Sequence, residues 1–367
     1  MALRFLTSTL LIAACSPIAS GATFNAAAKT NVAVYYGQGP NQKPLTTYCT
    51  DPSIDIIILS FVNLFPQQAN GFPGINFGNQ CSGKTYPGPG YNGTRPRPAT
   101  DHLQVCPDLQ RALASCRAKR PDAKILLSLG GGTADYQLTG ARDGEAFADT
   151  LWAMFGPRQK NTKLPRPLDN GSAAFAVDGF DLDIEHPSLD KAAGYKALVK
   201  RLRALYAREK GTYYLTASPQ CVVPDANMAE ILKATSFDMV FVQFYNTPQC
   251  SARRWVDSHP SSSKPSTSSD GGFTFDAWTA FLSSAGSKNA RVYIGLPGSA
   301  AAAGGPGNDV TAAQAADLAR AFYCRPAFGG VAIWEATYAA ANVVKGRNFY
   351  QGVKDGLLGV GKGAKCK

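Results

Sequence analysis

Histidine is scarce in this sequence, which holds only His102, His186 and His259, far apart from one another. No two cysteines have the C-x-x-C spacing. Structural zinc sites are built from such cysteine pairs and from closely spaced histidines, so both absences argue against a structural metal site. We expect no metal and no other cofactor.

Long apolar runs are missing beyond the N-terminus, where no stretch reaches the roughly 20 residues that a transmembrane helix needs. At the N-terminus, Arg4 precedes an apolar run over residues 5–14, and small residues follow at 19–22. This order is typical of a secretory signal peptide. We expect residues 1–22 to be removed and residues 23–367 to form a secreted protein with no membrane anchor.

Clustered basic segments are also absent, although the formal net charge is +11. The lysines and arginines are dispersed, and no basic run is interleaved with aromatic residues, as a nucleic-acid interface would require. We therefore expect a basic secreted monomer with no nucleic-acid partner. Adhesion to anionic cell walls would be compatible with this charge.

A dinucleotide-binding turn is missing after the first predicted strand. The segment Gly37-Gln38-Gly39 continues into Pro40 and Asn41, without a third glycine or a helix start. The phosphate-binding fingerprint needs both, so a dinucleotide-binding open sheet is disfavoured.

Cysteine, by contrast, is well represented. Of the nine cysteines, Cys15 lies in the predicted signal peptide, which leaves an even number, eight, in the mature chain. An even number of cysteines in a secreted chain indicates disulfide bonds rather than metal ligation or a thiol nucleophile.

The order of predicted elements indicates the fold class. Apolar segments with strand character occupy residues 31–36, 54–62, 124–130, 178–185, 212–218, 238–245, 292–296 and 330–334. Mostly helical segments connect them, which predicts a (β/α)8 TIM barrel forming a single catalytic domain with a basic C-terminal tail. We expect Ser188 to cap one helix, Thr311 and Gln314 to form a capping box on another, and the last helix to span residues 341–353.

The fourth segment carries alternating acidic residues. Phe180, Leu182 and Ile184 would share one face of the strand, and Asp181, Asp183 and Glu185 the other. Because neighbouring strands are almost wholly apolar, the acidic face should point into the barrel. Three carboxylates so close in a low-dielectric interior cannot all ionise easily, so at least one should hold a proton near neutral pH. Glu185 ends the strand, and parallel barrels place their chemistry at that end.

Two motifs of the chain resemble markers of glycoside hydrolase family 18. Residues 178–185 resemble its D-G-x-D-x-D-x-E signature, and Ser128 to Gly131 resemble its S-x-G-G motif at the end of the third strand. Segments at 35–38, 74–77, 243–246, 295–297 and 329–334 look like the class III, hevamine-like chitinases of plants and fungi. The resemblance covers about residues 31–352 and implies an endochitinase that cleaves β-1,4-linked N-acetylglucosamine in chitin or its oligosaccharides.

The resemblance also implies roles for individual residues. Glu185 would be the general acid and base, with the substrate's own acetamido group as nucleophile instead of a second carboxylate. Asp183 would stabilise the positive intermediate, and Asp181 would share a proton with it. Tyr245 would donate a hydrogen bond to the acetamido oxygen, and Trp334 would form the aromatic floor. Gln243, Tyr35 and Phe61 would line the cleft.

Further implications concern the cysteines and the cleft rim. The family's cysteine order implies the pairs Cys49–Cys116, Cys81–Cys106 and Cys221–Cys250, which leaves Cys324–Cys366. Tyr36 and Glu335 depart from the family pattern and should alter the rim of the cleft. Independently of the resemblance, Asn92 and Asn170 lie in N-x-S/T glycosylation sequons.

Several alternatives stay open on the sequence. The acidic strand alone could be a structural hydrogen-bond network or a D-x-D site for a divalent metal. The same fold also includes non-catalytic members, which act as lectins or as inhibitors of other hydrolases. Within the enzyme class, an endo-β-N-acetylglucosaminidase acting on N-glycans is the rival, and cleavage of peptidoglycan is a possible side activity.

Overall fold

The computed structural model describes residues 24–88, 101–133, 136–160, 162–260, 271–305 and 307–366. The predicted signal peptide and the sequon at Asn92 lie outside these residues. The described helices are all too short or too polar to cross a lipid bilayer.

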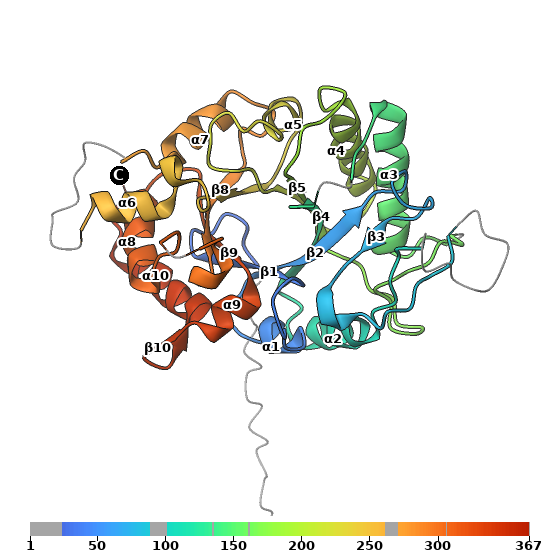
Figure 1. Cartoon of the computed structure of the whole chain (residues 1–367), viewed down its shortest axis with the longest axis horizontal. Coiled ribbons are helices and arrows are strands. Elements are labelled where there is room, and N and C mark those ends of the chain that lie inside the picture. The colour runs from blue at the N-terminus through green and yellow to red at the C-terminus, as the bar shows by residue number, and fades with distance from the viewer. Residues whose placement is uncertain are drawn as a thin grey trace, which may run out of the picture.

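Eight parallel strands form a closed barrel, as the sequence predicts (Figure 1). The pairing order is β1-β9-β8-β7-β6-β5-β4-β2, and β1 pairs with β2 to close the ring. The barrel strands are β1 (Asn31–Tyr36), β2 (Ile56–Leu64), β4 (Lys124–Gly131), β5 (Gly179–Ile184), β6 (Tyr214–Ala217), β7 (Met239–Gln243), β8 (Arg291–Pro297) and β9 (Phe328–Trp334). The short strand β3 (Gly74–Ile75) adds to β2 in the antiparallel direction.

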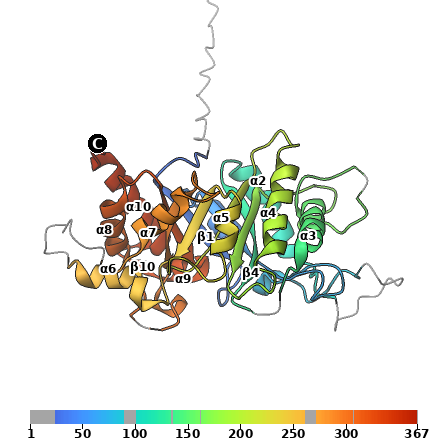
Figure 2. The same ribbon diagram turned by 90° about the horizontal axis from the view of Figure 1, so that it is seen from above.

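Helices surround the barrel in both views (Figures 1 and 2). They are α1 (Thr46–Cys49), α2 (Pro107–Lys119), α3 (Gly140–Phe155), α4 (Ala193–Tyr206), α5 (Ala229–Ala234), α6 (Ala252–Ser258), α7 (Phe275–Ser283), α8 (Ala312–Phe322), α9 (Ala336–Ala341) and α10 (Phe349–Gly363). Short 3-10 turns lie at Gly78–Gln80, Pro248–Cys250 and Ala300–Ala302, and β10 (Val343–Val344) pairs with β11 (Arg347–Asn348) as a hairpin. On opposite flanks, α3 packs against α4 and α8 against α10.

The strands have two buried faces because side chains alternate along each strand. On β1, Val32 and Val34 join the large apolar cluster between the barrel and the helices, whereas Ala33 and Tyr35 join a smaller cluster inside the barrel. On β5, Phe180 and Leu182 belong to the outer cluster. The acidic side chains of β5 therefore point inward, which confirms the predicted orientation of that strand.

The last helix does not lie where we predicted it. Residues 341–353 contain the end of α9, the β10–β11 hairpin and only the start of α10, and the supposed basic tail is helical to Gly363. Asn348 and Gln351 form a capping box that opens α10. Gly352 and Gly356 let α10 lie close to α8, because a Cβ at either position would meet Ala312 or Ala316. The prediction failed because the glycines that allow this close contact between α10 and α8 also give the C-terminal sequence the composition of an irregular tail.

Helix starts elsewhere match the sequence only in part. The Thr311–Gln314 capping box on α8 is confirmed. Ser188 is not the cap of α4, which begins after Ala192. Instead, the Asp190 carboxylate accepts hydrogen bonds from the first amides of α4, and the Ser188 hydroxyl donates to Asp190. A carboxylate near a helix start is the better acceptor for these unpaired amides.

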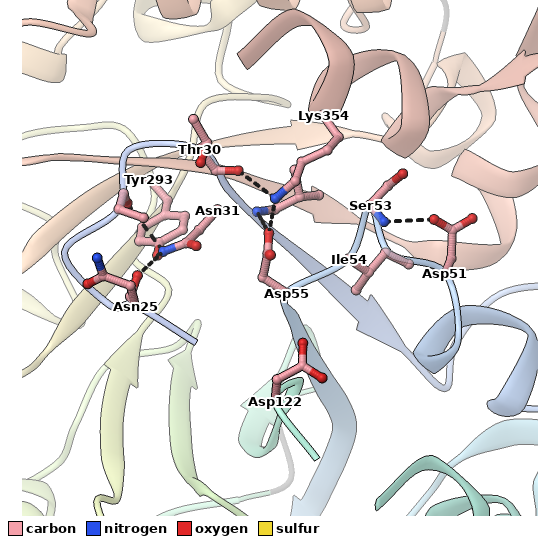
Figure 3. A network of polar contacts seen from close by, with 12 residues as sticks. Asn25, Thr30, Asn31, Asp51, Ser53, Ile54, Asp55, Asp122, Tyr293 and Lys354 are labelled. Atoms are coloured by element: carbon pink, nitrogen blue, oxygen red, sulfur yellow. Dashed lines mark hydrogen bonds and ion pairs between the residues drawn. The ribbon is translucent and has the colours of Figure 1, made fainter. Parts of the chain in front are cut away.

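The last helix is joined to the first strands at the amino ends of the barrel strands (Figure 3). Lys354 of α10 donates to the Asp55 carboxylate at 2.6 Å and to the Thr30 carbonyl at 2.9 Å. The same carboxylate of Asp55 accepts the Val32 amide at 2.7 Å. The polar network thereby fastens α10 to the closing seam of the barrel.

Four disulfides reinforce the loops and the C-terminal segment. They join the three pairs implied by the family resemblance, Cys49–Cys116, Cys81–Cys106 and Cys221–Cys250, and the remaining pair Cys324–Cys366. The last of them links the end of α8 to the residues after α10.

Candidate active site

A pocket lies at the carboxyl ends of the barrel strands and encloses about 680 Å³, part of it open to solvent. Its lining includes Gln243 and Trp334, the last residues of β7 and β9, and Glu185, the residue after β5. The predicted site residues that line it are Tyr35, Phe61, Asp183, Glu185, Gln243, Tyr245 and Trp334. The structure therefore brings together residues that span about 300 positions of the sequence.

Asp181 is the one predicted site residue below the pocket rather than in its lining. Its side chain is fully buried, and four hydroxyls reach its carboxylate. Ser128 donates at 2.7 Å, Thr216 at 2.6 Å, Ser218 at 3.1 Å and Tyr35 at 3.2 Å. Burial raises the pKa of Asp181, while these hydrogen bonds act in the opposite direction and favour the charged form.

The hydroxyls compete for the acceptor positions of Asp181. A carboxylate has about four such positions, and the hydroxyls of Tyr35 and Ser218, which both reach Asp181, also contact each other. The charges of both Glu185 and Asp181 act on Asp183. The sharing of a proton between Asp181 and Asp183 stays a prediction.

The pair Asp183 and Glu185 sits in an environment that favours protonation. Burial, followed by the charges of Glu185 and Asp181, raises the pKa of Asp183 well above its ordinary value. Burial also raises the pKa of Glu185, and the charge of Asp225 adds to that effect. Two neighbouring carboxyls repel each other when both are ionised, so this environment favours protonation of one of the pair.

Gln243 holds the two carboxyls from β7, which is separated from β5 by β6 alone. Its side-chain amide donates to Asp183 at 3.0 Å, to Glu185 at 3.4 Å and to the Ser218 carbonyl at 3.0 Å. Such an amide fixes the positions of both carboxyls but cannot take up a proton near neutral pH. Gln243 is therefore an orienting group in the site.

Aromatic rings form one wall of the pocket. Trp334 packs on Phe61 with 5.9 Å between ring centroids and on Tyr35 with 5.6 Å. Flat, weakly polar surfaces of this kind suit the apolar faces of a sugar ring, with polar groups opposite to fix its orientation. The arrangement fits a carbohydrate better than a compact charged ligand.

Tyr245 lies beside the acidic pair and is almost fully buried. Burial raises the pKa of Tyr245 well above its usual value, and the charges of Asp183 and Glu185 add to the rise. The phenol therefore stays protonated and available as a hydrogen-bond donor.

Several groups of the site were not predicted. Ser218, Phe241 and Asn246 line the pocket, and Ser128, Thr216 and Ser218 hold Asp181. Strand alternation could have revealed Thr216 and Ser218, because Asp181 pairs in register with Thr216 and residues two apart share a face. Ser128 is part of the S-x-G-G motif, but the sequence did not indicate that its hydroxyl donates to Asp181.

Tyr36 and Glu335, expected to alter the rim, do not reach the pocket. Both are fully buried outside its lining. The Tyr36 hydroxyl donates to the Lys43 carbonyl, and the Glu335 carboxylate accepts the amides of Thr337 and Tyr338 at the start of α9. Burial raises the pKa of Glu335 to about 7. Tyr36 therefore packs within the outer core against Tyr48, and Glu335 caps α9, so both departures from the family pattern concern buried residues rather than the rim.

The described side chains offer no cluster of metal-binding groups. Within the described ranges, no group of three histidine, cysteine, aspartate or glutamate side chains is arranged to hold a metal ion. The oxygens of Asp181 are occupied by hydroxyl donors, which a cation would have to displace.

Comparison with known proteins agrees with this geometry. The sequence profile described as "Glycosyl hydrolases family 18" matches residues 31–324. The chain is 36% identical over 352 residues to "Endochitinase A1" of Aspergillus fumigatus, covering 95% of this chain and 39% of that protein. It thus spans about two fifths of the length of that relative.

Solved structures show the same fold. The ICChI chitinase from Ipomoea carnea matches with a TM-score of 0.65 and 26% identity, covering 89% of this chain and 99% of that one. A xylanase and α-amylase inhibitor protein, XAIP-II from Scadoxus multiflorus, matches with a TM-score of 0.64 and 24% identity, covering 90% of this chain and 98% of that one. The second likeness concerns the fold alone.

Proposed function

The chain belongs to glycosyl hydrolase family 18, and on that premise we propose that it is a secreted endochitinase. It hydrolyses β-1,4 linkages between N-acetylglucosamine units of chitin or its oligosaccharides. The observation that carries this proposal is the buried Asp183–Glu185 pair, held by Gln243 beside the Trp334 wall of an open pocket. The similarity to Endochitinase A1 of Aspergillus fumigatus supports the same activity.

The first chemical step needs a proton donor and a nucleophile. Glu185 donates its proton to the glycosidic oxygen as the bond from the anomeric carbon to that oxygen breaks. The carbonyl oxygen of the substrate's 2-acetamido group attacks the anomeric carbon, as in the substrate-assisted mode known for this family. The product of this step is a cyclic oxazolinium ion with a free chain leaving.

Asp183 and Tyr245 act on the acetamido group. The Asp183 carboxylate accepts the acetamido N–H and stabilises the positive charge that develops. The Tyr245 hydroxyl donates to the acetamido oxygen and orients it for attack. Asp181 lies beneath Asp183, and its negative charge adds to the raised pKa of that residue.

Hydrolysis of the intermediate completes the reaction. Glu185, now a carboxylate, takes a proton from water as the water oxygen attacks the anomeric carbon and the oxazolinium ring opens. Two inversions at the same carbon leave its configuration unchanged. The reaction therefore needs no second protein carboxylate as a nucleophile.

Secretion and processing are part of the proposal. Residues 1–22 act as the signal peptide, and four disulfides suit an extracellular protein. Asn170 is exposed and open to glycosylation. The chain acts as a monomer, and its basic charge favours contact with anionic cell walls.

The direct test is a product and anomer assay on N-acetylglucosamine hexamers. An endochitinase with the proposed mechanism releases dimers to tetramers, with the β-anomer first. Release of single sugars only would contradict internal cleavage, and the α-anomer first would contradict retention of configuration.

The alternatives predict other outcomes in that assay. A lectin or inhibitor of this fold would bind the hexamer or another hydrolase without releasing products. An endo-β-N-acetylglucosaminidase would leave the hexamer intact and cleave a high-mannose glycopeptide. We favour an enzyme over a lectin or inhibitor because Asp181, Asp183 and Glu185 are all present and hydrogen-bonded in the pocket region. The similarity to a fungal endochitinase favours chitin over N-glycans as the substrate.

The pH dependence follows from the raised pKa of Glu185. The acid must carry its proton at the start of each turnover, so activity is retained below that pKa and lost as the pH rises through it. We expect a profile of kcat/KM with its maximum at mildly acidic pH and a fall on the alkaline side. A flat profile up to about pH 9 would contradict the role of Glu185 as the acid.

A further inference from the structure

Tyr136 lies on the loop between β4 and α3, outside the pocket lining, yet it contacts the backbone that carries the acidic pair. Its hydroxyl accepts a hydrogen bond from the Glu185 amide at 3.0 Å. The same hydroxyl donates to two carbonyls, that of Gly131 at 2.9 Å and that of Asp183 at 3.2 Å. One side chain therefore links the end of β4 to both residues of the acidic pair.

These contacts occur where the sheet stops supporting β5. The pairing of β5 with β4 ends at Ile184, opposite Gly131, and its pairing with β6 ends at Leu182. The Glu185 amide consequently lies beyond the last sheet pairing. A buried amide without a partner costs about 1–3 kcal/mol in general, and the Tyr136 hydroxyl supplies that partner.

The surroundings fix the Tyr136 ring. Its side chain is 1% exposed, with the Phe65 ring at 5.0 Å and the His186 ring at 4.2 Å between centroids. Gly130 makes room for the hydroxyl, because a Cβ at that position would meet the Asp183 carbonyl and the tip of the Tyr136 ring. The glycine of the S-x-G-G motif thus allows the contact to form.

We propose that Tyr136 is a positioning residue for the reaction: its hydroxyl holds the backbone of Asp183 and Glu185 so that both carboxyls face Gln243 and the substrate. The proposal rests on the hydrolase activity proposed above. It differs from a purely structural role because it predicts a selective loss in the chemical step, with substrate binding retained.

The test is Tyr136→Phe, which deletes the hydroxyl and keeps the ring. On N-acetylglucosamine hexamers, kcat should fall roughly 10- to 100-fold, since small misplacements of a reacting group have effects of that order. KM should stay within about twofold, because the pocket lining is untouched. The alkaline limb of kcat should move to lower pH as Glu185 leaves its buried position for water.

The matched control is Tyr195→Phe. Tyr195 is fully buried near the same Phe65 ring, and within the described residues its hydroxyl makes no hydrogen bond to β5. Its kcat should stay within about twofold of wild type. If Tyr136→Phe has wild-type kcat, if it raises KM alone, or if both variants lose kcat equally, Tyr136 does not position the acid.

Two further measurements keep the inference testable. If Tyr136→Phe does not fold, the second variant is Phe65→Leu, which loosens the packing of the Tyr136 ring but keeps the Tyr136 hydroxyl. The kcat of this variant should fall and its KM should be retained. An unchanged kcat would count against the proposal. Carbon-13 NMR titration of Glu185, assigned with Glu185→Gln, needs no turnover and should show a lower pKa in Tyr136→Phe. An inactive wild type would overturn the proposed function, whereas an unchanged Glu185 titration would overturn the role of Tyr136.

Discussion

Replacing Glu185 by glutamine should reduce kcat on N-acetylglucosamine hexamers by roughly 10²- to 10⁴-fold, the range over which a general acid contributes. The side chain keeps its size, so Gln243 and the aromatic wall remain in place. Binding of the hexamer, measured by calorimetry, should therefore stay close to that of wild type. The loss belongs to the proton transfer, because an amide cannot donate to the leaving oxygen as a carboxylic acid does.

The control for that variant is Glu230→Gln, the same chemical change on the exposed surface of α5, where Glu230 pairs with Lys233. It should leave kcat unchanged. A Glu185→Gln protein with near-normal turnover would remove Glu185 from the mechanism, and loss of hexamer binding would indicate a damaged pocket rather than a missing proton.

Fully deacetylated glucosamine hexamers should not be turned over at a measurable rate. The free amine cannot supply the carbonyl oxygen that attacks the anomeric carbon, so the intramolecular nucleophile is lost. Well-oriented intramolecular nucleophiles correspond to effective molarities of about 10⁵–10⁸ M, so water at ordinary concentration cannot replace one. The measurement is product release by chromatography at equal concentrations of acetylated and deacetylated hexamer.

A partly acetylated hexamer provides the internal control in that experiment. Every cut should lie immediately after an acetylated sugar, because that sugar contributes the nucleophile. Rapid cleavage of the fully deacetylated hexamer, or cuts placed without regard to acetylation, would contradict substrate assistance.

The orientation of β5 was predictable from the sequence, because a period of two separates its apolar and acidic faces and both faces have clear partners. Its neighbours were harder to predict. The hydroxyls of Thr216 and Ser218 follow the same period on the next strand of the predicted barrel, but a single sequence does not give the register that sets Thr216 opposite Asp181. Those hydroxyls donate the hydrogen bonds that hold the Asp181 carboxylate.

Tyr136 illustrates a second limit. It lies on a loop and has no periodic pattern around it. Its hydroxyl contacts backbone atoms of Asp183 and Glu185, which are 47 and 49 positions further along the sequence. Loop residues that bond to backbone leave little trace in composition. Only the coordinates show that its hydroxyl lies where the sheet ends.

The C-terminal region shows a third limit. The sequence there contains a signal for a helix start, but its high glycine content argued against a helix. Asn348 and Gln351 have the spacing of a capping box, yet the glycines that follow suggested a tail. Helix propensity disfavours glycine by about 1 kcal/mol per residue. Close packing on Ala312 and Ala316 overrides that preference.

The attachment of α10 to Asp55 affects how the protein reaches its native state. Lys354 and Asp55 are 299 residues apart in the sequence, so this contact forms only once most of the polypeptide has been synthesised. Until β9 arrives, one edge of β1 has no partner and can template pairing with other nascent chains. Productive folding should therefore depend on chaperones that shield the incomplete barrel.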